Sequence, residues 1–162
     1  MQDLRAMGER IGRLLNERGQ TVAVSESSTG GLVSAALLAV PGASAYFLGG
    51  GIIYTRSARD ALLGIGDADM KGLRSSSEPY ARLAARAIRD RLGADWGLSE
   101  TGAAGPTGNR YGDAAGHTCM AVAGPLEAAK TLETGSDDRQ GNMWRFAEAT
   151  LALFEHCLRR DG

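Results

Sequence analysis

The chain of 162 residues has few cysteines and almost no net charge. Cys119 and Cys157 lie far apart with one histidine near each, so the sequence spells out neither a disulfide framework nor a zinc ribbon. A formal net charge of −1 provides no basic field of the kind that drives sequence-independent binding to nucleic acid. We therefore expect two buried thiols, no metal ion, and no DNA or RNA partner.

Long hydrophobic runs are also absent. No run approaches the roughly 18 apolar residues that a membrane-spanning helix needs, and the first ten residues are too charged for a signal peptide. The composition, 43% hydrophobic and 23% charged, is that of an ordinary globular protein. These features predict a single cytoplasmic domain over residues 1–162, with no membrane partner.

Glycine is abundant, with 23 residues, which is about twice the average frequency of roughly 7%. The glycines gather in short groups: Gly30 with Gly31, three at 49–51, and five between Gly102 and Gly116. Clusters of this kind are typical of turns and of points where backbone comes close to a ligand, rather than of a flexible linker.

Hydrophobic periodicity predicts alternating helices and strands. Helices are expected over 3–17, 32–40, 57–63, 77–92 and 140–159, and strands from residue 22 and over 45–55, 94–101, 116–123 and 128–133. This order predicts an α/β fold, a layered α/β/α arrangement around a mixed sheet whose last two strands are antiparallel.

The stretch 22–32 (VAVSESSTGGL) reads as a strand, a tight loop and the start of a helix. It sets the hydroxyls of Ser27, Ser28 and Thr29 before a helix N-terminus, where unpaired N–H groups favour an anion or oxyanion. Thr29 is a candidate helix cap. The competing interpretation is that the hydroxyls only cap the helix and satisfy the turn.

Ligands of such folds bind outside the carboxyl ends of the strands. That rule gathers the Ser27 loop, the segment 54–59 and the glycine-rich loop 101–109 at one crevice. Convergence of three polar, glycine-flanked loops favours a binding site there.

Five short motifs, in order, extend this pattern over nearly the whole chain: 26–31 (ESSTGG), 41–47 (PGASAYF), 54–59 (YTRSAR), 76–78 (SSE) and 101–106 (TGAAGP). Together they resemble the C-terminal domain of the CinA (competence/damage-inducible) family, which also occurs as stand-alone nicotinamide-nucleotide amidohydrolases. The family's versions of the first, third and last motifs are ESCTGG, Y-(S/T)-NEAK and TGIAGP.

The resemblance implies deamidation of nicotinamide mononucleotide to nicotinate mononucleotide and ammonia, in pyridine-nucleotide salvage, without metal or cofactor and in a homodimer. It makes Ser27 the nucleophile and Arg59 the position of the motif lysine that acts as base, with Tyr54 and Thr101 in support. Backbone N–H groups of Gly30 and Gly31 would hold the oxyanion. The substrate-binding residues that it suggests are Ser28, Thr29, Gly30, Gly31, Gly102, Gly105 and Arg139, the last one for phosphate.

One departure from the family bears directly on this chemistry. Arginine stays protonated at biological pH, so Arg59 cannot accept the proton of Ser27. Three alternatives follow: an amidohydrolase in which His117, Tyr54 or a water replaces the lysine; a nucleotide- or phosphate-binding domain without turnover; or a structural domain with a vestigial pocket. The retained hydroxyls and glycines argue against the third.

Overall fold

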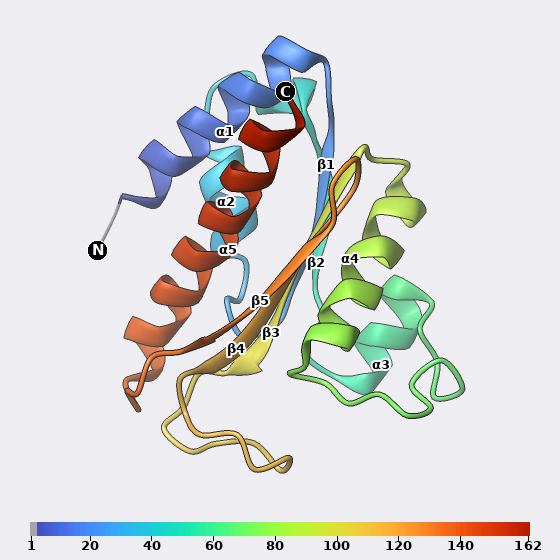
Figure 1. Ribbon diagram of the computed structural model, residues 1–162, viewed down its shortest axis with the longest axis vertical. Coiled ribbons are helices and arrows are strands. Elements are labelled where there is room, and N and C mark those ends of the chain that lie inside the picture. Colours follow the sequence, from blue (N-terminus) through green and yellow to red (C-terminus); the bar gives the residue numbers. More distant parts are fainter. Residues whose placement is uncertain (1–2) are drawn as a thin grey trace.

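The computed structural model describes residues 3–162 and contains a five-stranded mixed sheet between two layers of helices (Figure 1). The strand order is β2–β1–β3–β4–β5, in which β1 pairs in parallel with β2 and β3, and the other pairs are antiparallel. The predicted layered α/β fold is thus confirmed. The strands are β1 (Val22–Glu26), β2 (Phe47–Ile52), β3 (Trp96–Ala103), β4 (His117–Ala123) and β5 (Ala128–Glu133). Residues 1–2, which the single-domain prediction includes, lie outside the described residues.

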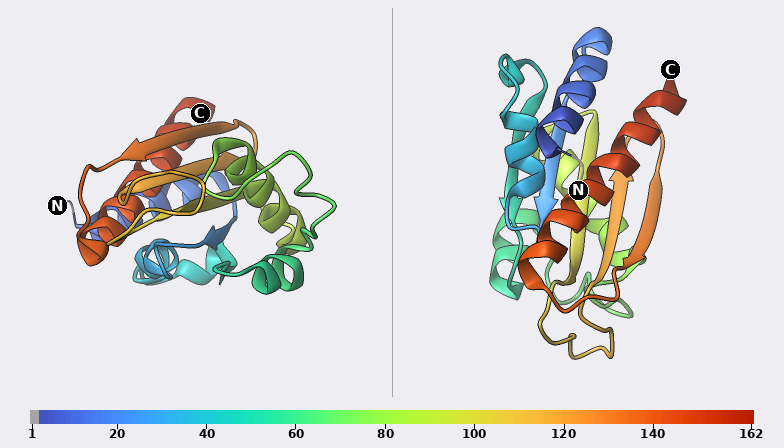
Figure 2. Two further views of the ribbon diagram at one scale, coloured as in Figure 1. Left: turned by 90° about the horizontal axis from the view of Figure 1, so that it is seen from below. Right: turned by 90° about the vertical axis from the view of Figure 1, so that its left-hand side faces the viewer.

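One face of the sheet is covered by α1 (Leu4–Arg18), α2 (Leu32–Leu38) and α5 (Arg139–Asp161), as the right-hand view of Figure 2 shows. Their apolar faces form the larger core cluster with the inward side chains of the strands. The helices α1 and α2 approach so closely that a Cβ at Gly8 would lie 2.1 Å from the carbonyl oxygen of Ala36. Glycine at this position therefore permits the crossing.

The other face is covered by α4 (Glu78–Leu92), with α3 (Arg56–Ala58) and η2 (Arg59–Leu63), a single π-type turn, beside it (Figure 1). Small residues let α4 lie close to the sheet, since a Cβ at Gly97 would lie 2.0 Å from the carbonyl oxygen of Ala85. The carboxyl ends of β1, β2 and β3 lie beside α3 and the loop that precedes α4.

Several predicted boundaries are wrong. The strand expected over 45–55 is only β2, because Gly42 turns the chain with a φ of 84° into a short 3-10 helix, η1 (Ala43–Ala45), before it. Helix α2 ends at Leu38 rather than at residue 40. Strand β3 extends to Ala103, because its last residues pair with β4.

Both cysteines are buried free thiols, as predicted. None of the helices within residues 3–162 combines the length and the apolar character that crossing a membrane requires.

Candidate functional site

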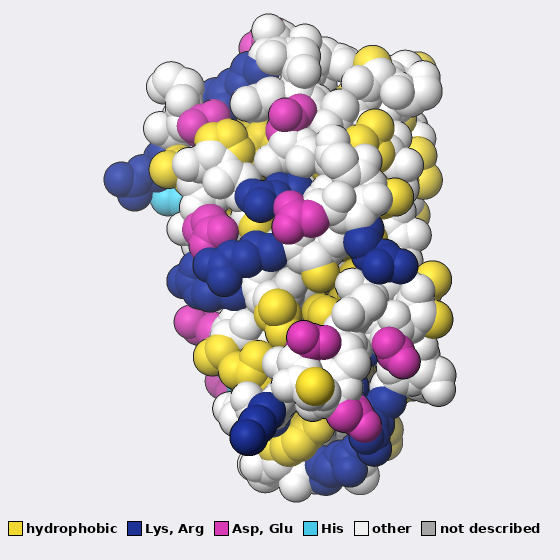
Figure 3. Space-filling model, turned by 90° about the vertical axis from the view of Figure 1, so that its right-hand side faces the viewer, with side chains coloured by type: hydrophobic (Ala, Val, Ile, Leu, Met, Phe, Trp, Pro, Cys, Tyr) yellow, Lys and Arg dark blue, Asp and Glu magenta, His cyan; other side chains and the backbone are white. Residues whose placement is uncertain are grey.

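A pocket with a volume of about 590 Å³ opens at the carboxyl ends of β1, β2 and β3. Its walls come from segments far apart in the sequence, and charged side chains are interspersed with apolar ones on the adjoining face of the molecule (Figure 3). The lining residues are Ser27, Ile53, Tyr54, Thr55, Arg56, Arg59, Asp67, Met70, Leu73, Arg74, Ser75, Ser76, Tyr80, Thr101, Gly102, Arg110 and Tyr111. The structure thus brings the three predicted loops together and adds the 67–76 segment.

The turn that carries Ser27 is held by two buried carboxylates. The first is Glu26, which is 0% exposed and accepts hydrogen bonds from the backbone N–H groups of Gly31, Val33 and Ser34 at 3.1, 2.9 and 2.8 Å. These are the unpaired donors of the α2 N-terminus, where a negative charge is favoured. The prediction that Thr29 caps α2 is therefore wrong, and the helix N-terminus is occupied by the chain's own carboxylate.

The second carboxylate is Glu100 of β3, 2% exposed, which lies beneath the same turn. It accepts from the backbone N–H groups of Ser27 at 3.1 Å and Thr29 at 2.9 Å. The hydroxyls of Ser28, Thr29 and Thr118 also donate to it. Because so many donors converge on it, Glu100 fixes the turn in the way a bound anion would.

Ser27 itself remains available at the floor of the pocket. Its backbone N–H is bound to Glu100, but within residues 3–162 no side chain hydrogen-bonds to its Oγ. Ser28 and Thr29, by contrast, are buried and their hydroxyls are directed to carboxylates. Of the three predicted hydroxyl residues, only Ser27 lines the pocket.

The glycines next to the turn serve the fold. The N–H of Gly30 donates to the carbonyl oxygen of Ser27 at 3.1 Å, and that of Gly31 donates to Glu26. Gly102 and Gly105 are explained by close packing, since a Cβ would lie 2.5 Å from the carbonyl oxygen of His117 and 2.8 Å from that of Asp137, respectively. In this structure neither of the two predicted oxyanion donors is free.

Arg59 lines the pocket and is 7% exposed. Its Nε donates to the carbonyl oxygen of Ile65 at 3.0 Å, and its Nη2 donates to Asp67 at 2.9 Å. Asp67 is shared with Arg56, and hydrogen bonds from both guanidinium groups, first that of Arg56, hold the pKa of this carboxyl below its usual value. Arg59 is therefore a fixed cation at the pocket wall.

Tyr54 lines the mouth of the pocket and is 61% exposed. Its hydroxyl accepts a hydrogen bond from Arg139 at 3.1 Å, and Arg139 also donates to the carbonyl oxygen of Gly105 at 2.6 Å. Arg139 and Gly105 are not among the lining residues of the pocket. The phosphate contact of Arg139 stays a prediction, and the structure shows this side chain bracing Tyr54 against the glycine-rich loop.

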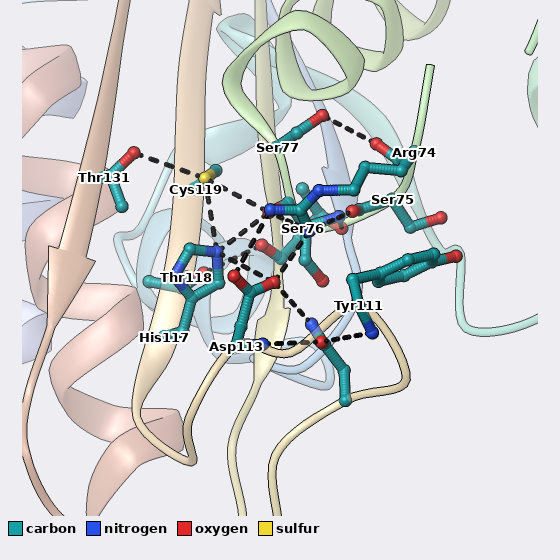
Figure 4. Close-up of polar contacts among 12 residues, drawn as sticks. Arg74, Ser75, Ser76, Ser77, Tyr111, Asp113, His117, Thr118, Cys119 and Thr131 are labelled. Carbon is teal, nitrogen blue, oxygen red and sulfur yellow. Dashed lines mark hydrogen bonds and ion pairs between the residues drawn. The ribbon is translucent and has the colours of Figure 1, made fainter. Parts of the chain in front are cut away.

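Another part of the pocket wall is a polar network around Ser76 (Figure 4). Ser76 has a φ of 55°, a left-handed conformation that is unusual for a residue other than glycine and costs about 1–3 kcal/mol. Its N–H donates to Thr101 Oγ1 at 3.1 Å, and Arg74 donates to its carbonyl oxygen at 3.3 Å and to Asp113 at 2.7 Å. Because Thr101 accepts this bond, its own hydroxyl hydrogen stays free to donate within the pocket.

His117, the histidine that the sequence suggested as a replacement base, is not a lining residue. Its Nδ1 faces Glu133, and its Nε2 lies 2.8 Å from the carbonyl oxygen of Ser76. Both ring nitrogens are engaged, so His117 has none left for the proton of Ser27.

The pocket is rich in arginine. Arg56, Arg59, Arg74 and Arg110 line it, against the single carboxylate of Asp67. Within residues 3–162, Arg110 forms no ion pair, and it lies 5.7 Å from the ring centroid of Tyr111. Such a surplus of guanidinium groups suits a phosphate or carboxylate ligand. No group of three or more histidine, cysteine or acidic side chains in the described part of the chain is arranged to hold a metal ion.

Sequence reasoning missed Glu100, Arg74, Arg110 and Tyr111. Glu100 offered a signal, because a carboxylate in the middle of a predicted strand needs polar partners when it is buried. The other three lie in irregular loops, and only the tertiary structure brings them to the pocket.

Comparison with known proteins is consistent with this geometry. A family model described as "CinA C-terminal domain" matches residues 4–158. A CinA-like protein from Synechocystis sp. is 39% identical over 160 residues, which cover 98% of this chain and 38% of the relative. Another, from Prochlorococcus marinus, is 48% identical over 112 residues, which cover 69% of this chain and 26% of the relative. The chain thus spans well under half the length of these curated relatives.

Solved structures agree with the fold. The crystal structure of a competence or damage-inducible protein from Enterobacter asburiae matches with a TM-score of 0.90 at 26% identity, covering 98% of this chain and 99% of that one. A CinA superfamily protein from Klebsiella pneumoniae gives 0.91 at 23% identity, with the same coverage. With the family model matching nearly all of its length, this chain belongs to the CinA C-terminal-domain family.

Proposed function

We propose that this chain binds a phosphorylated pyridine nucleotide in the pocket and hydrolyses its carboxamide, converting nicotinamide mononucleotide and water to nicotinate mononucleotide and ammonia. The observation that carries the proposal is the placement of Ser27. Ser27 lines an arginine-rich pocket, on a turn whose neighbouring groups are fixed by two buried carboxylates. Membership of the CinA C-terminal-domain family supports it.

In the proposed reaction, Ser27 Oγ attacks the carboxamide carbon while its proton passes to a base. As the carbon–nitrogen bond breaks, the base returns this proton to the departing nitrogen, so that ammonia leaves and an ester with Ser27 remains. A water molecule then hydrolyses the ester, releasing the carboxylate product and restoring the serine hydroxyl. The free hydroxyl hydrogen of Thr101 is the donor we assign to the developing oxyanion.

The site offers no strong base for the proton of Ser27. Arg59 stays charged, His117 is engaged on both nitrogens, and Glu26 and Glu100 accept hydrogen bonds throughout the turn. We assign proton removal to Tyr54 or to a water in the pocket. Since a positioned general base is worth about 10²–10⁴-fold, we expect slow turnover.

The test is an ammonia-release assay on the purified chain with nicotinamide mononucleotide, paired with calorimetric measurement of binding. Ser27→Ala should abolish release and leave binding nearly unchanged. The matched control is Ser44→Ala, the same substitution at an exposed serine that does not line the pocket. Release by Ser27→Ala at the wild-type rate would refute an ester intermediate on this residue.

A second candidate function is binding of the nucleotide without turnover. It is favoured by the charge of Arg59, which the ion pair with Asp67 holds at the pocket wall, because this fixed cation suits a phosphate group but cannot accept the proton of Ser27. Binding with no detectable ammonia supports this candidate, and absence of both binding and release refutes both.

A further inference from the structure

His117 occupies an unusual position for a histidine. It begins β4, is 5% exposed, and lies behind the wall of the pocket rather than in it. Its Nδ1 contacts the carboxylate of Glu133 on β5, and its Nε2 lies 2.8 Å from the carbonyl oxygen of Ser76 (Figure 4). Asp113, from the loop before β4, lies 3.5 Å from the same Nε2.

Both hydrogen-bond partners of the ring can only accept. A backbone carbonyl and an ionised carboxylate carry no hydrogen to donate, and a neutral imidazole carries only one N–H. The neutral ring would therefore point a nitrogen lone pair at one of two acceptor oxygens. Only the imidazolium, with a hydrogen on each nitrogen, satisfies Glu133 and Ser76 at once.

The charges around the ring agree with this state. The carboxylates of Glu133 and Asp113 face it, and the guanidinium of Arg74, which contacts the same oxygen of Asp113 and the same carbonyl oxygen of Ser76, is the one cation beside it among residues 3–162. On β4, Cys119 Sγ lies 3.7 Å from Nε2, and burial raises the pKa of this thiol, which stays neutral. On α4, Glu78 reaches the cluster through the hydroxyl of Thr131.

These surroundings act on the pKa of His117 in opposite directions. Burial lowers it, whereas the contact with Glu133, the hydrogen bond to Ser76 and the charges of Glu133 and Asp113 raise it. The net pKa lies above the ordinary value of 6.5. A raised folded-state pKa means that the protonated ring stabilises the fold fully below 6.5 and that this stabilisation is lost as pH rises through the folded-state value.

Ser76 is the link from His117 to the pocket. It is the only residue other than glycine with a positive φ in the described part of the chain, so its conformation depends on the contacts that hold it. Its carbonyl oxygen accepts from His117, while its N–H donates to Thr101 Oγ1. Ser75, Ser76 and Thr101 all line the pocket.

We propose that His117 is a positioning residue whose imidazolium, together with Arg74, holds the carbonyl oxygen of the strained Ser76, and through Ser76 positions Thr101, so that loss of the His117 proton weakens this clamp and loosens the pocket wall. The effect of this clamp on nucleotide affinity rests on the function proposed above. The clamp itself can be tested without that function, because it is a property of the free protein.

The clamp is tested by NMR titration of the ¹⁵N-labelled chain. The chain has two histidines, His117 and the exposed His156, so His156→Gln leaves one imidazole to follow. We expect His117 to carry hydrogens on both nitrogens at about pH 6, to titrate above 6.5, and to shift the amide signals of Ser76 and Thr101 with the same midpoint. Glu133→Gln should lower that midpoint. A neutral ring at about pH 6, or amide signals of Ser76 and Thr101 that ignore the titration, overturns the proposal.

Affinity is the second measurement. The dissociation constant for nicotinamide mononucleotide, measured at about pH 6 and about pH 8.5, should rise about fivefold in the wild type, the equivalent of one weakened hydrogen bond. In His117→Gln, whose amide does not titrate, this part of the pH dependence should vanish, while His156→Gln should keep it. An unchanged pH dependence in His117→Gln overturns the clamp. If the nucleotide binds at no pH, the proposed function fails, and the amide titration still decides the clamp.

Discussion

Replacement of Arg59 by lysine tests whether a missing base limits the proposed reaction. The position lines the pocket and is almost fully buried. Arginine cannot lose its proton at biological pH, whereas a lysine amine can do so when it is desolvated or lies beside another cation. Arg56, which shares Asp67 with Arg59, supplies that neighbouring charge. Arg59→Lys therefore installs a side chain that is able to accept the proton of Ser27.

The expected gain is smaller than the full value of a base. With the ordinary lysine pKa of about 10.4, roughly one amine in 10³ is neutral near pH 7.4, and burial beside Arg56 increases that fraction by about tenfold. Multiplied by the 10²–10⁴-fold that a positioned base supplies, this predicts an increase of about tenfold. Asp67 opposes the gain because its charge favours the ammonium form. Adding Asp67→Asn should give roughly tenfold more.

The substitution also has a structural cost. One ammonium group cannot reproduce the two directions in which Arg59 donates, to the carbonyl oxygen of Ile65 and to Asp67. Loss of one hydrogen bond costs about 0.5–1.5 kcal/mol of stability, which lowers the melting temperature by roughly 2–5 °C. The variant should therefore remain folded at assay temperature, and a melting curve recorded beside the assay checks this.

Ammonia release at saturating nicotinamide mononucleotide is the assay, with Arg56→Lys as the matched control. Arg56 pairs with the same carboxylate, but its side chain is 69% exposed, so we expect no gain there. Two results would refute the reasoning. One is a wild type that already turns over at roughly 1–10³ per second. The other is a folded Arg59→Lys whose activity is unchanged, which would leave binding without turnover as the better explanation.

Three further substitutions probe the turn and the ligand. Glu100→Gln replaces charge-assisted hydrogen bonds by neutral ones and should lower the free energy of unfolding, measured in urea, by about 1–3 kcal/mol. The control Glu9→Gln, at an exposed residue, should lower it by less than about 0.5 kcal/mol. Equal effects of the two substitutions would mean that Glu100 does not hold the Ser27 turn. Arg110→Ala and Arg139→Ala test the predicted phosphate contact, because loss of that contact should weaken binding of nicotinamide mononucleotide by about tenfold and binding of its dephosphorylated nucleoside hardly at all. If Arg139→Ala alone discriminates between them, the phosphate lies at Arg139.

The order of elements could be predicted because each helix and strand carries its own hydrophobic period. The α1 face with Met7, Ile11 and Leu15 buried is visible in the sequence and in the core. Boundaries failed where a tertiary partner decides them. Strand β3 continues to Ala103 because β4 pairs there, and α2 is capped by Glu26, a strand residue that a search for hydroxyl caps passes over.

The position of the site could be predicted from the sequence, but not the contacts within it. The rule that ligands bind at the carboxyl ends of strands placed Ser27, Tyr54 and Thr101 around one pocket, and all three line it. The rule could not say that the N–H groups of Gly30 and Gly31 are used within the chain, because their partners depend on the exact path of the turn. Nor could it find Arg110, which reaches the pocket on a loop without periodic structure.

The two proposals predict opposite effects of rising pH on activity. Proton removal from Ser27 becomes easier as pH rises, because any base in the pocket is then more often deprotonated. The clamp of Ser76 by His117 weakens over the same change, because the ring loses the hydrogen that one of its two acceptors needs. Because the clamp acts on affinity, kcat/KM depends on both the deprotonated base and the protonated His117, so its pH profile should have a rising and a falling limb. His117→Gln removes only the cause of the falling limb, and the rising limb that remains then reports the base alone.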